Sequence, residues 1–291
     1  MVNAIANLAK YFDKEMIKPL QQRFVGRKLV PKNNELSGKG LGMESVDVWT
    51  LLRMADATIS LGLPTGFGDT ADVTSETLNL PVLAEPFVLP RRMYESYKMA
   101  GIGIEAALAI EAAYRVQLAE EALILDGWKP DGATYTIKGL YQSAGNAEAT
   151  ADDFGTYGKA TEKVTLAKAL LEADSVYGPY NLVLNQVQHN QLLASESANG
   201  NPEWDRVMTI LNDGGSGPAQ IFSSPIQAVD TGMMLAVPDK TYFDLVIPQD
   251  YKSQLNEDPK LGTLSPLYGM VYESLAPRIK QVNSICKLTA I

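Results

Sequence analysis

Apolar side chains near the start of the chain recur every three or four positions. They are Ile5, Leu8, Phe12, Met16 and Leu20, with polar residues largely on the other side. This spacing predicts an amphipathic helix over residues 2–21 that ends near Pro19. Its polar face mixes Asp13 and Glu15 with lysines, which disfavours membrane binding because membrane-surface helices carry a strongly basic face. The favoured interpretation of the stripe is packing on the protein's own body, and docking of a partner comes second.

The pattern then changes to a period of two, after a basic, glycine-rich connector over residues 26–42. The alternating positions are Val46, Val48 and Thr50 in a first strand, and Leu78, Leu80, Val82 and Ala84 towards the end of the segment. Glycines and prolines lie between them, and residues 54–90 contain no lysine or arginine. We predict an extended β ribbon over residues 43–89. Because an isolated two-stranded ribbon is marginal in water, it needs another surface, and a neighbouring copy of the chain is the simplest source.

The segment Ile104–Leu125 is rich in alanine, leucine and glutamate, which are strong helix formers. At about 1.5 Å per residue, this predicted helix is long enough to act as a spine. Its expected buried stripe consists of Ile104, Ala107, Leu108, Tyr114, Leu118 and Leu125. Its acids are Glu105, Glu111, Glu120 and Glu121. The E-x-x-H pairs of di-iron bundles are missing, so we interpret these acids as solvated or intersubunit faces.

Helices and strands alternate irregularly in the rest of the chain. Helices are predicted over residues 161–173, 186–194 and 204–211, and strands over 135–137, 181–184, 221–223, 233–237, 243–247, 268–273 and 279–282. The regular period of a doubly wound sheet is absent, so the predicted fold class is α+β.

Composition narrows the class of protein. With 291 residues and 46% hydrophobic content, the chain can build a substantial core. Its net charge of -9 argues against an outer surface that binds nucleic acid, although a container for nucleic acid is compatible with it. The only cysteine, Cys286, lies in an apolar run, which fits packing and a reducing compartment. We see no signal-peptide or membrane-span pattern, so we expect a soluble, intracellular protein.

Two features are candidates for chemistry. Gly101 and Gly103 begin a G-x-G-x-x-A motif, but no buried strand precedes it, so entry into a helix explains it better than dinucleotide binding. His189 is the only histidine, which excludes metal sites that need two imidazoles, and no G-x-S-x-G elbow accompanies it. We expect no catalytic residue, no cofactor and no metal. A dinucleotide-binding enzyme is the alternative from another class.

The order of the predicted elements resembles that of encapsulins and of the tailed-phage major capsid proteins that share the Hong Kong 97-like fold. Three stretches are similar to these families: residues 115–128 (RVQLAEEALILDGW) followed by IKGL, residues 181–193 (NLVLNQVQHNQLL), and residues 221–229 (IFSSPIQAV) with the later YESLAPRI. The short amino-terminal helix is more similar to encapsulins, since phage proteins more often carry a scaffolding segment or a flexible arm there.

The resemblance implies a division of the chain. Residues 1–42 would be the amino-terminal helix and arm, 43–89 an extended loop overlapping a neighbour, 90–132 and 233–291 a peripheral domain, and 133–232 an axial domain. It further implies a closed icosahedral shell made of many copies, which encloses a cargo protein. Candidate pore residues are Ser195, Glu196, Ser197 and Asn199, and the candidate cargo-docking helix carries Ile5, Leu8, Phe12 and Met16.

Two points remain open between the related families. A major capsid protein that packages DNA in a virus or provirus is the alternative to a cytoplasmic nanocompartment, so the expected location is the cytoplasm or a virion. Some phage capsids lock their extended loops through a lysine in that loop, and this chain has none between residues 54 and 90. We therefore predict non-covalent assembly.

Overall fold

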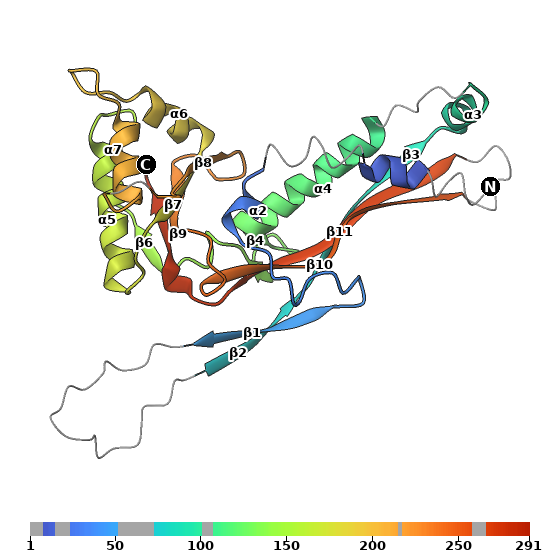
Figure 1. The fold of residues 1–291 in the computed structure, drawn as a ribbon, viewed down its shortest axis with the longest axis horizontal. Coiled ribbons are helices and arrows are strands. Elements are labelled where there is room, and N and C mark those ends of the chain that lie inside the picture. Colours follow the sequence, from blue (N-terminus) through green and yellow to red (C-terminus); the bar gives the residue numbers. More distant parts are fainter. Residues whose placement is uncertain (1–7, 15–23, 52–72, 101–106, 215–216, 258–265) are drawn as a thin grey trace, which may run out of the picture.

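The computed structural model describes residues 8–14, 24–51, 73–100, 107–214, 217–257 and 266–291. A three-stranded sheet and a five-stranded sheet form the body, and a two-stranded ribbon projects from it (Figure 1). The predicted α+β class is confirmed, because helices pack on mixed and antiparallel sheets without a repeated βαβ order.

The first sheet is antiparallel and has the order β10 (Phe243–Glu257), β11 (Leu267–Ile279) and β3 (Val82–Leu89). The spine helix α4 (Ala107–Leu125) runs along it with the short helix α2 (Gly26–Leu29) at its side, and the helix α3 (Arg91–Ala100) lies beyond the other end of α4 (Figure 1). Residues 8–14 form a helical turn whose Leu8 and Phe12 are buried in the same core as Leu89, Ala113 and Val271. This core joins the start of the chain to its carboxyl-terminal third.

The second sheet is mixed, with the order β6 (Asn146–Glu148), β12 (Ile285–Thr289), β9 (Thr231–Ala236), β7 (Tyr180–Asn185) and β8 (Ile221–Ser224). The helices α5 (Lys159–Ala173), α6 (Gln186–Ala194) and α7 (Glu203–Leu211) lie beside it. Every residue of β7 is buried, as a central strand requires.

Strand pairing crosses the boundary that was expected between the peripheral and axial parts. Residue 232 lies inside β9, and β12 belongs to the second sheet although residues 233–291 were expected in the peripheral part. The physical reason is strand pairing, since β12 is bonded to β6 on one side and to β9 on the other. The strand predicted over 279–282 is also wrong, because β11 ends at Ile279 and the 3-10 turn η2 (Val282–Ser284) leads into β12.

The ribbon consists of β1 (Ser45–Leu51) and β2 (Val73–Asn79), which pair antiparallel from Ser45 opposite Asn79 to Leu51 opposite Val73. The expected alternation holds in β1, where Val46 and Val48 are buried. It changes phase at Pro81: Leu80 is buried before it, but Val82 is exposed after it. The segment Val82–Leu89 therefore leaves the ribbon and joins the first sheet as β3, so the ribbon is shorter than the predicted 43–89.

The predicted stripe of the spine helix has the wrong phase. Ala107 and Leu108 are exposed, and Tyr114 and Leu118 are only half-buried, whereas Leu125 is buried as expected. The buried positions are Ala109, Ala112, Ala113, Val116, Gln117, Glu120, Glu121, Leu123, Ile124 and Leu125. Ile104 and the motif at Gly101 lie outside the described residues. After α4, a tight hairpin of β4 (Gly127–Trp128) and β5 (Ile137–Lys138) turns the chain towards the second sheet.

Candidate functional site

The ribbon presents two different faces. On one face Val46 packs with Leu80, Val246 and Ala276 into a small core that fixes the ribbon root to the first sheet. On the other face the side chain of Trp49 is 59% exposed, the largest such value for a described tryptophan. Because one face is already occupied, the Trp49 face is the one available to another molecule.

Further exposed apolar surface surrounds the ribbon root. A groove of about 470 Å³ lies between the start of β3 and the end of α4, lined by Leu80, Val82, Leu83, Ala122, Trp128 and Ile137 among others. Val82 and Trp128 at this groove are each about half exposed, at 54% and 45%. Large exposed apolar residues gathered in one place are typical of contact surfaces.

Charge is distributed unevenly between the ribbon and the arm before it. In the sequence, residues 44–80 of the ribbon segment carry Glu44, Asp47, Asp56, Asp69, Asp72 and Glu76 against the single base Arg53. The arm carries Arg27, Lys28, Lys32 and Lys39 against the single acid Glu35. Lys28, Lys32 and Lys39 are exposed. Acidic and basic surfaces of one chain are complementary between copies of that chain.

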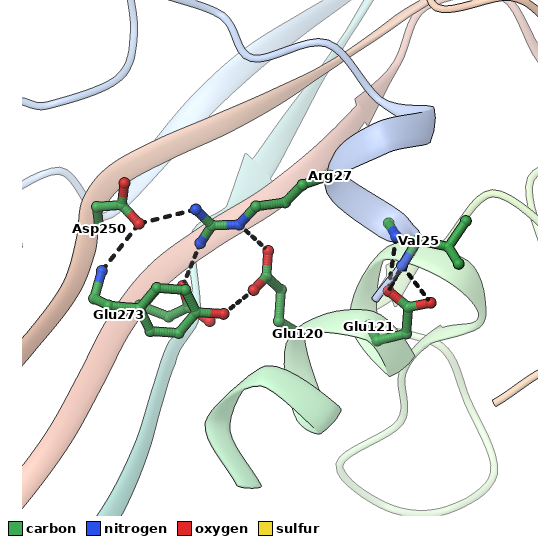
Figure 2. A network of polar contacts seen from close by, with 8 residues as sticks. Val25, Arg27, Glu120, Glu121, Asp250 and Glu273 are labelled. Carbon is green, nitrogen blue, oxygen red and sulfur yellow. Dashed lines mark hydrogen bonds and ion pairs between the residues drawn. The ribbon is translucent and has the colours of Figure 1, made fainter. Parts of the chain in front are cut away.

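A buried polar junction holds the arm against the spine. Glu121 accepts hydrogen bonds from the backbone N–H groups of Val25, at 3.1 Å, and of Gly26, at 2.7 Å, at the start of α2 (Figure 2). It also accepts one from the hydroxyl of Ser224 at the end of β8, at 3.1 Å. A Cβ on Gly26 would lie 2.9 Å from the terminal methyl of Ile124 and 3.0 Å from Oε2 of Glu121, so a larger residue here would have to displace these side chains. One carboxylate thus joins the arm, the spine and the second sheet.

Beside Glu121, the guanidinium of Arg27 contacts three carboxylates from three elements. Its Nε lies 2.5 Å from Glu120 of α4, and its two Nη atoms lie 3.0 Å from Asp250 of β10 and 2.8 Å from Glu273 of β11 (Figure 2). The ring of Tyr251 lies under the guanidinium, 4.7 Å from its central carbon, and the Tyr251 hydroxyl donates to Glu120. Arg27 therefore ties the arm to the spine and to the first sheet.

Burial and charge shift the titration of this junction. Burial opposes the charged form of Arg27, but Glu120, Tyr251 and Glu273 outweigh it and raise the pKa of Arg27 above its ordinary value. Burial raises the pKa of Tyr251, and Glu120 and Glu273 add to this. Burial also raises the pKa of Glu121, against the effect of its hydrogen bonds to Gly26 and Val25. Such shifts accompany structural ion-pair networks as well as active sites.

The interpretation of the spine acids as solvated or intersubunit groups is wrong for Glu120 and Glu121, which are 2% and 1% exposed and bonded within the subunit. Glu111 is exposed and pairs with Arg115 at 2.9 Å, and Glu105 lies outside the described residues. The signal for Glu120 was present in the sequence, because it follows Ala109, Ala113 and Val116 at helical spacing.

The candidate pore loop connects α6 to α7 at an outer corner of the molecule (Figure 1). Ser195 does not fit the prediction: it is 6% exposed and its hydroxyl donates to Glu203 at 2.8 Å. Glu196 and Asn199 are exposed, and Ser197, which is half-buried, closes the loop through hydrogen bonds with the backbone of Asn201.

In the candidate cargo-docking helix, Leu8 and Phe12 are each 1% exposed and are used in the core. Asp13 accepts hydrogen bonds from the backbone and hydroxyl of Ser253, at 2.8 and 2.7 Å. Ile5 and Met16 lie outside the described residues. The described turn is therefore held by the body, while Tyr11 beside it is 40% exposed.

Other candidates for chemistry have structural explanations. His189 lies edge-on to Trp204, with ring centroids 5.4 Å apart, and burial lowers its pKa. Cys286 is buried, which raises the pKa of its thiol to about 12. Within the described ranges, no group of three or more histidines, cysteines or acids is arranged to hold a metal ion. None of the described helices combines the length and apolar composition needed to cross a membrane.

Comparisons with known proteins agree with this arrangement. The family model described as "Encapsulating protein for peroxidase" matches residues 5–260. A virus-like particle from Pyrococcus furiosus is similar in structure, with a TM-score of 0.67 at 15% identity over 96% of this chain and 98% of that one. The capsid of an empty GTA particle matches with a TM-score of 0.63 at 16% identity over 91% and 89%. The capsid of Myoviridae phage XM1 matches with 0.60 at 14% identity over 91% and 90%. These solved structures establish the Hong Kong 97-like capsid fold.

Proposed function

This chain belongs to the family of encapsulating proteins, and on that premise we propose that its ribbon and arm join neighbouring copies into a closed icosahedral nanocompartment. The protein is a structural shell protein that assembles from many copies of itself. The observation that carries the proposed joint is the ribbon, which has one face fixed to its own body and the other exposed around Trp49. A projecting pair of strands in this state gains stability from a second copy.

The partner surface that fits the ribbon best is the basic arm of a neighbour. The ribbon segment is acidic, and Lys28, Lys32 and Lys39 of the arm are exposed. Exposed charges that steer association are screened by salt, with a Debye length of about 8 Å at 0.15 M. We expect assembly to slow as salt rises, and more steeply for the wild type than for a variant with Lys28, Lys32 and Lys39 changed to glutamine. Equal salt dependence of the two proteins in light-scattering kinetics would refute this pairing.

The joint is expected to be non-covalent, because the ribbon segment between residues 54 and 90 has no lysine for a cross-link. Denaturing gels of purified particles should give a single band at the subunit mass of 31.6 kDa. A ladder of multimers on reducing and non-reducing gels would contradict the proposal.

The proposed content of the shell is a cargo protein in the cytoplasm. The description of the family refers to a peroxidase, so a peroxidase is the first cargo to test. The docking surface would include the exposed Tyr11 and its neighbours in the amino-terminal helix, since Leu8 and Phe12 are already packed. A cargo enzyme that co-purifies with wild-type particles and is lost from Tyr11→Ala particles of the same size supports this surface. Undiminished loading of the variant would remove it.

Packaging of DNA is the second candidate, because phage and GTA capsids share the fold. Nuclease-resistant nucleic acid inside purified particles would favour it over protein cargo. The dinucleotide-binding enzyme would return only if the chain eluted as a monomer or dimer with bound nicotinamide. Negative-stain microscopy of the purified protein separates shell from enzyme.

A pore at a symmetry axis is proposed for the loop between α6 and α7, with Glu196, Ser197 and Asn199 as its lining. Its support is the exposure of Glu196 and Asn199 at a corner of the molecule. Replacing Glu196 with lysine should change the rate at which small ions enter intact particles, whereas the same change at Glu172, on α5, whose side chain is 39% exposed, should not. Identical entry rates for both variants would place the pore elsewhere.

A further inference from the structure

The loop between α6 and α7 is short, and its two sides are bonded to each other. At its root the backbone N–H of Glu203 donates to the carbonyl of Ser195 at 3.0 Å. One residue further on each side, Glu196 and Pro202 form an antiparallel bridge. The two sides of the loop therefore run against each other as a narrow finger, residues 195–203, which projects at a corner of the molecule (Figure 1).

The tip of the finger is closed in the same way. The N–H of Ser197 donates to the carbonyl of Asn201 at 2.9 Å, and the N–H of Asn201 donates to the hydroxyl of Ser197 at 3.0 Å. The N–H of Gly200 donates to the carbonyl of Ser197 at 2.8 Å. Gly200 has a φ of +77°, which this tight turn needs and which favours glycine. The finger cannot change shape by a local motion without breaking these bonds.

A buried carboxylate holds the root of the finger. Glu203, the first residue of α7, is 0% exposed. Its Oε2 accepts a hydrogen bond from the hydroxyl of Ser195 at 2.8 Å. Its Oε1 accepts from the backbone N–H of Thr161 at 2.8 Å and from the Thr161 hydroxyl at 2.9 Å. Thr161 lies in the first turn of α5, where backbone N–H groups have no partner within their own helix. Glu203 thus joins the finger to the starts of α5 and α7.

Both ends of the finger also begin in packed helices. Ser195 ends α6, and its N–H donates to the carbonyl of Gln191 at 2.9 Å. His189 of α6 lies edge-on to Trp204 of α7. A buried carboxylate is costly unless its oxygens are hydrogen-bonded, and both oxygens of Glu203 are. The root therefore has one favourable position, in which the Ser195 hydroxyl reaches Glu203.

We propose that Glu203 is the positioning residue of the finger, and that a pore lined by Glu196, Ser197 and Asn199 keeps a fixed aperture instead of opening and closing. This inference rests on the proposed pore for its aperture, whereas the rigidity of the finger belongs to the single subunit. Copies related by symmetry present identical fingers, so the gap between them is determined by where each subunit holds its own. A fixed gap excludes solutes above one sharp size limit.

Hydrogen exchange of the full-length dissociated subunit tests the finger by itself. The amides of Ser197, Gly200 and Glu203 should exchange far more slowly than those of an unfolded peptide. Ser195→Ala removes the hydroxyl that bonds Glu203 but leaves both bonds from Thr161. The three amides should then exchange about 10- to 100-fold faster, the effect of losing one hydrogen bond to a charged group. Amides of the buried strand β7 should keep their rates, because the loosening is local.

Thr209→Ala is the matched control for this measurement. Thr209 is exposed on α7, and its hydroxyl donates within the helix to the carbonyl of Asp205 at 2.8 Å. Its removal should leave exchange in the finger unchanged. Unprotected amides in the wild-type finger, or finger amides that exchange equally fast in Ser195→Ala and Thr209→Ala, would overturn the role of Glu203.

Glu203→Gln separates hydrogen bonding from charge. The glutamine oxygen can accept from Thr161, and its amide N–H can donate to the Ser195 hydroxyl, which accepts as well as donates. The finger of this variant should therefore be protected as in the wild type. Finger amides that exchange as fast as in Ser195→Ala would show that Glu203 does not act through these hydrogen bonds.

Entry of solutes of graded size into intact particles tests the aperture. Wild-type and Glu203→Gln particles should share one sharp size limit, and Ser195→Ala particles should admit larger solutes. Equal limits for wild type and Ser195→Ala, with a finger that hydrogen exchange shows to be loosened, would overturn the fixed aperture. Glu196→Lys then locates the failure: unchanged ion entry in that variant places the pore elsewhere, whereas changed ion entry keeps the pore and refutes only its rigidity.

Discussion

Truncation of Trp49 to alanine is the most direct perturbation of the proposed ribbon joint. A tryptophan side chain removes up to about 250 Å² from water when fully buried. Burial of the 59% that is exposed in the subunit would remove about 150 Å², worth about 3.7 kcal/mol at about 25 cal/mol per Å². Each subunit contributes one ribbon, so the loss applies once per subunit added to the shell.

The expected result is a large rise in the concentration needed for assembly. A loss of about 3.7 kcal/mol raises a dissociation constant about 400-fold, since about 1.4 kcal/mol corresponds to tenfold. Sedimentation velocity over a dilution series of dissociated and reassembled protein measures this threshold. The far-ultraviolet circular dichroism of the subunit should not change, because the removed side chain contacts little of its own body.

Two variants control for this experiment. Trp49→Phe keeps most of the apolar area and should raise the threshold only modestly. Thr77→Ala lies on the same face of the ribbon, on the neighbouring strand, and removes little apolar area. An assembly threshold for Trp49→Ala equal to that of Thr77→Ala would refute burial of this face between copies.

Three further predictions concern the subunit itself. Arg27→Ala should lower the free energy of unfolding by about 3 kcal/mol, because it leaves buried carboxylates unpaired. Removal of the exposed Arg115 should change the free energy of unfolding little, and equal denaturant midpoints for the two variants would refute a stabilising role of Arg27. Gly127→Ala should destabilise the hairpin after the spine, since its φ is +114° and a Cβ there would lie 2.3 Å from a backbone oxygen. Gly132→Ala is the control, because its φ is +72° but its Cβ would meet open space. Similar melting temperatures for the two variants would contradict the fold at this turn. Cys286 should resist thiol reagents in the native protein and react once unfolded, because burial raises its pKa to about 12, and rapid labelling of the native protein would show that the strand is exposed.

Local pattern predicted the elements whose partners lie nearby or whose faces are simple. The alternation in β1 identified Val46 and Val48 as buried, and the apolar run at Asn181–Leu184 identified the core of a central strand. Periodicity also located α5, α6 and α7 to within a few residues. Each of these elements has a single spacing of apolar residues along its length, so its position can be predicted from the sequence alone.

The predictions were wrong where contacts with residues far along the chain determine which sheet a strand joins or which side chain is buried. Pro81 ends one alternation and Val82 begins another, because β3 pairs with β11, far along the chain. The strand β12 lies in the second sheet because β6 and β9 flank it, which no local pattern indicates. Glu120 was interpreted as solvated because acids on helices usually are, although it lies in phase with the buried face of the spine. The approach of Arg27 from the arm, which supplies the cation that a buried carboxylate needs, could not be predicted from local pattern.

Electron cryomicroscopy of the assembled particle tests the central claim most directly. The account predicts a closed shell in which the Trp49 face of each ribbon lies against another copy of the chain. A particle in which that face contacts only its own subunit or solvent, or a protein that remains monomeric under all assembly conditions, would contradict it.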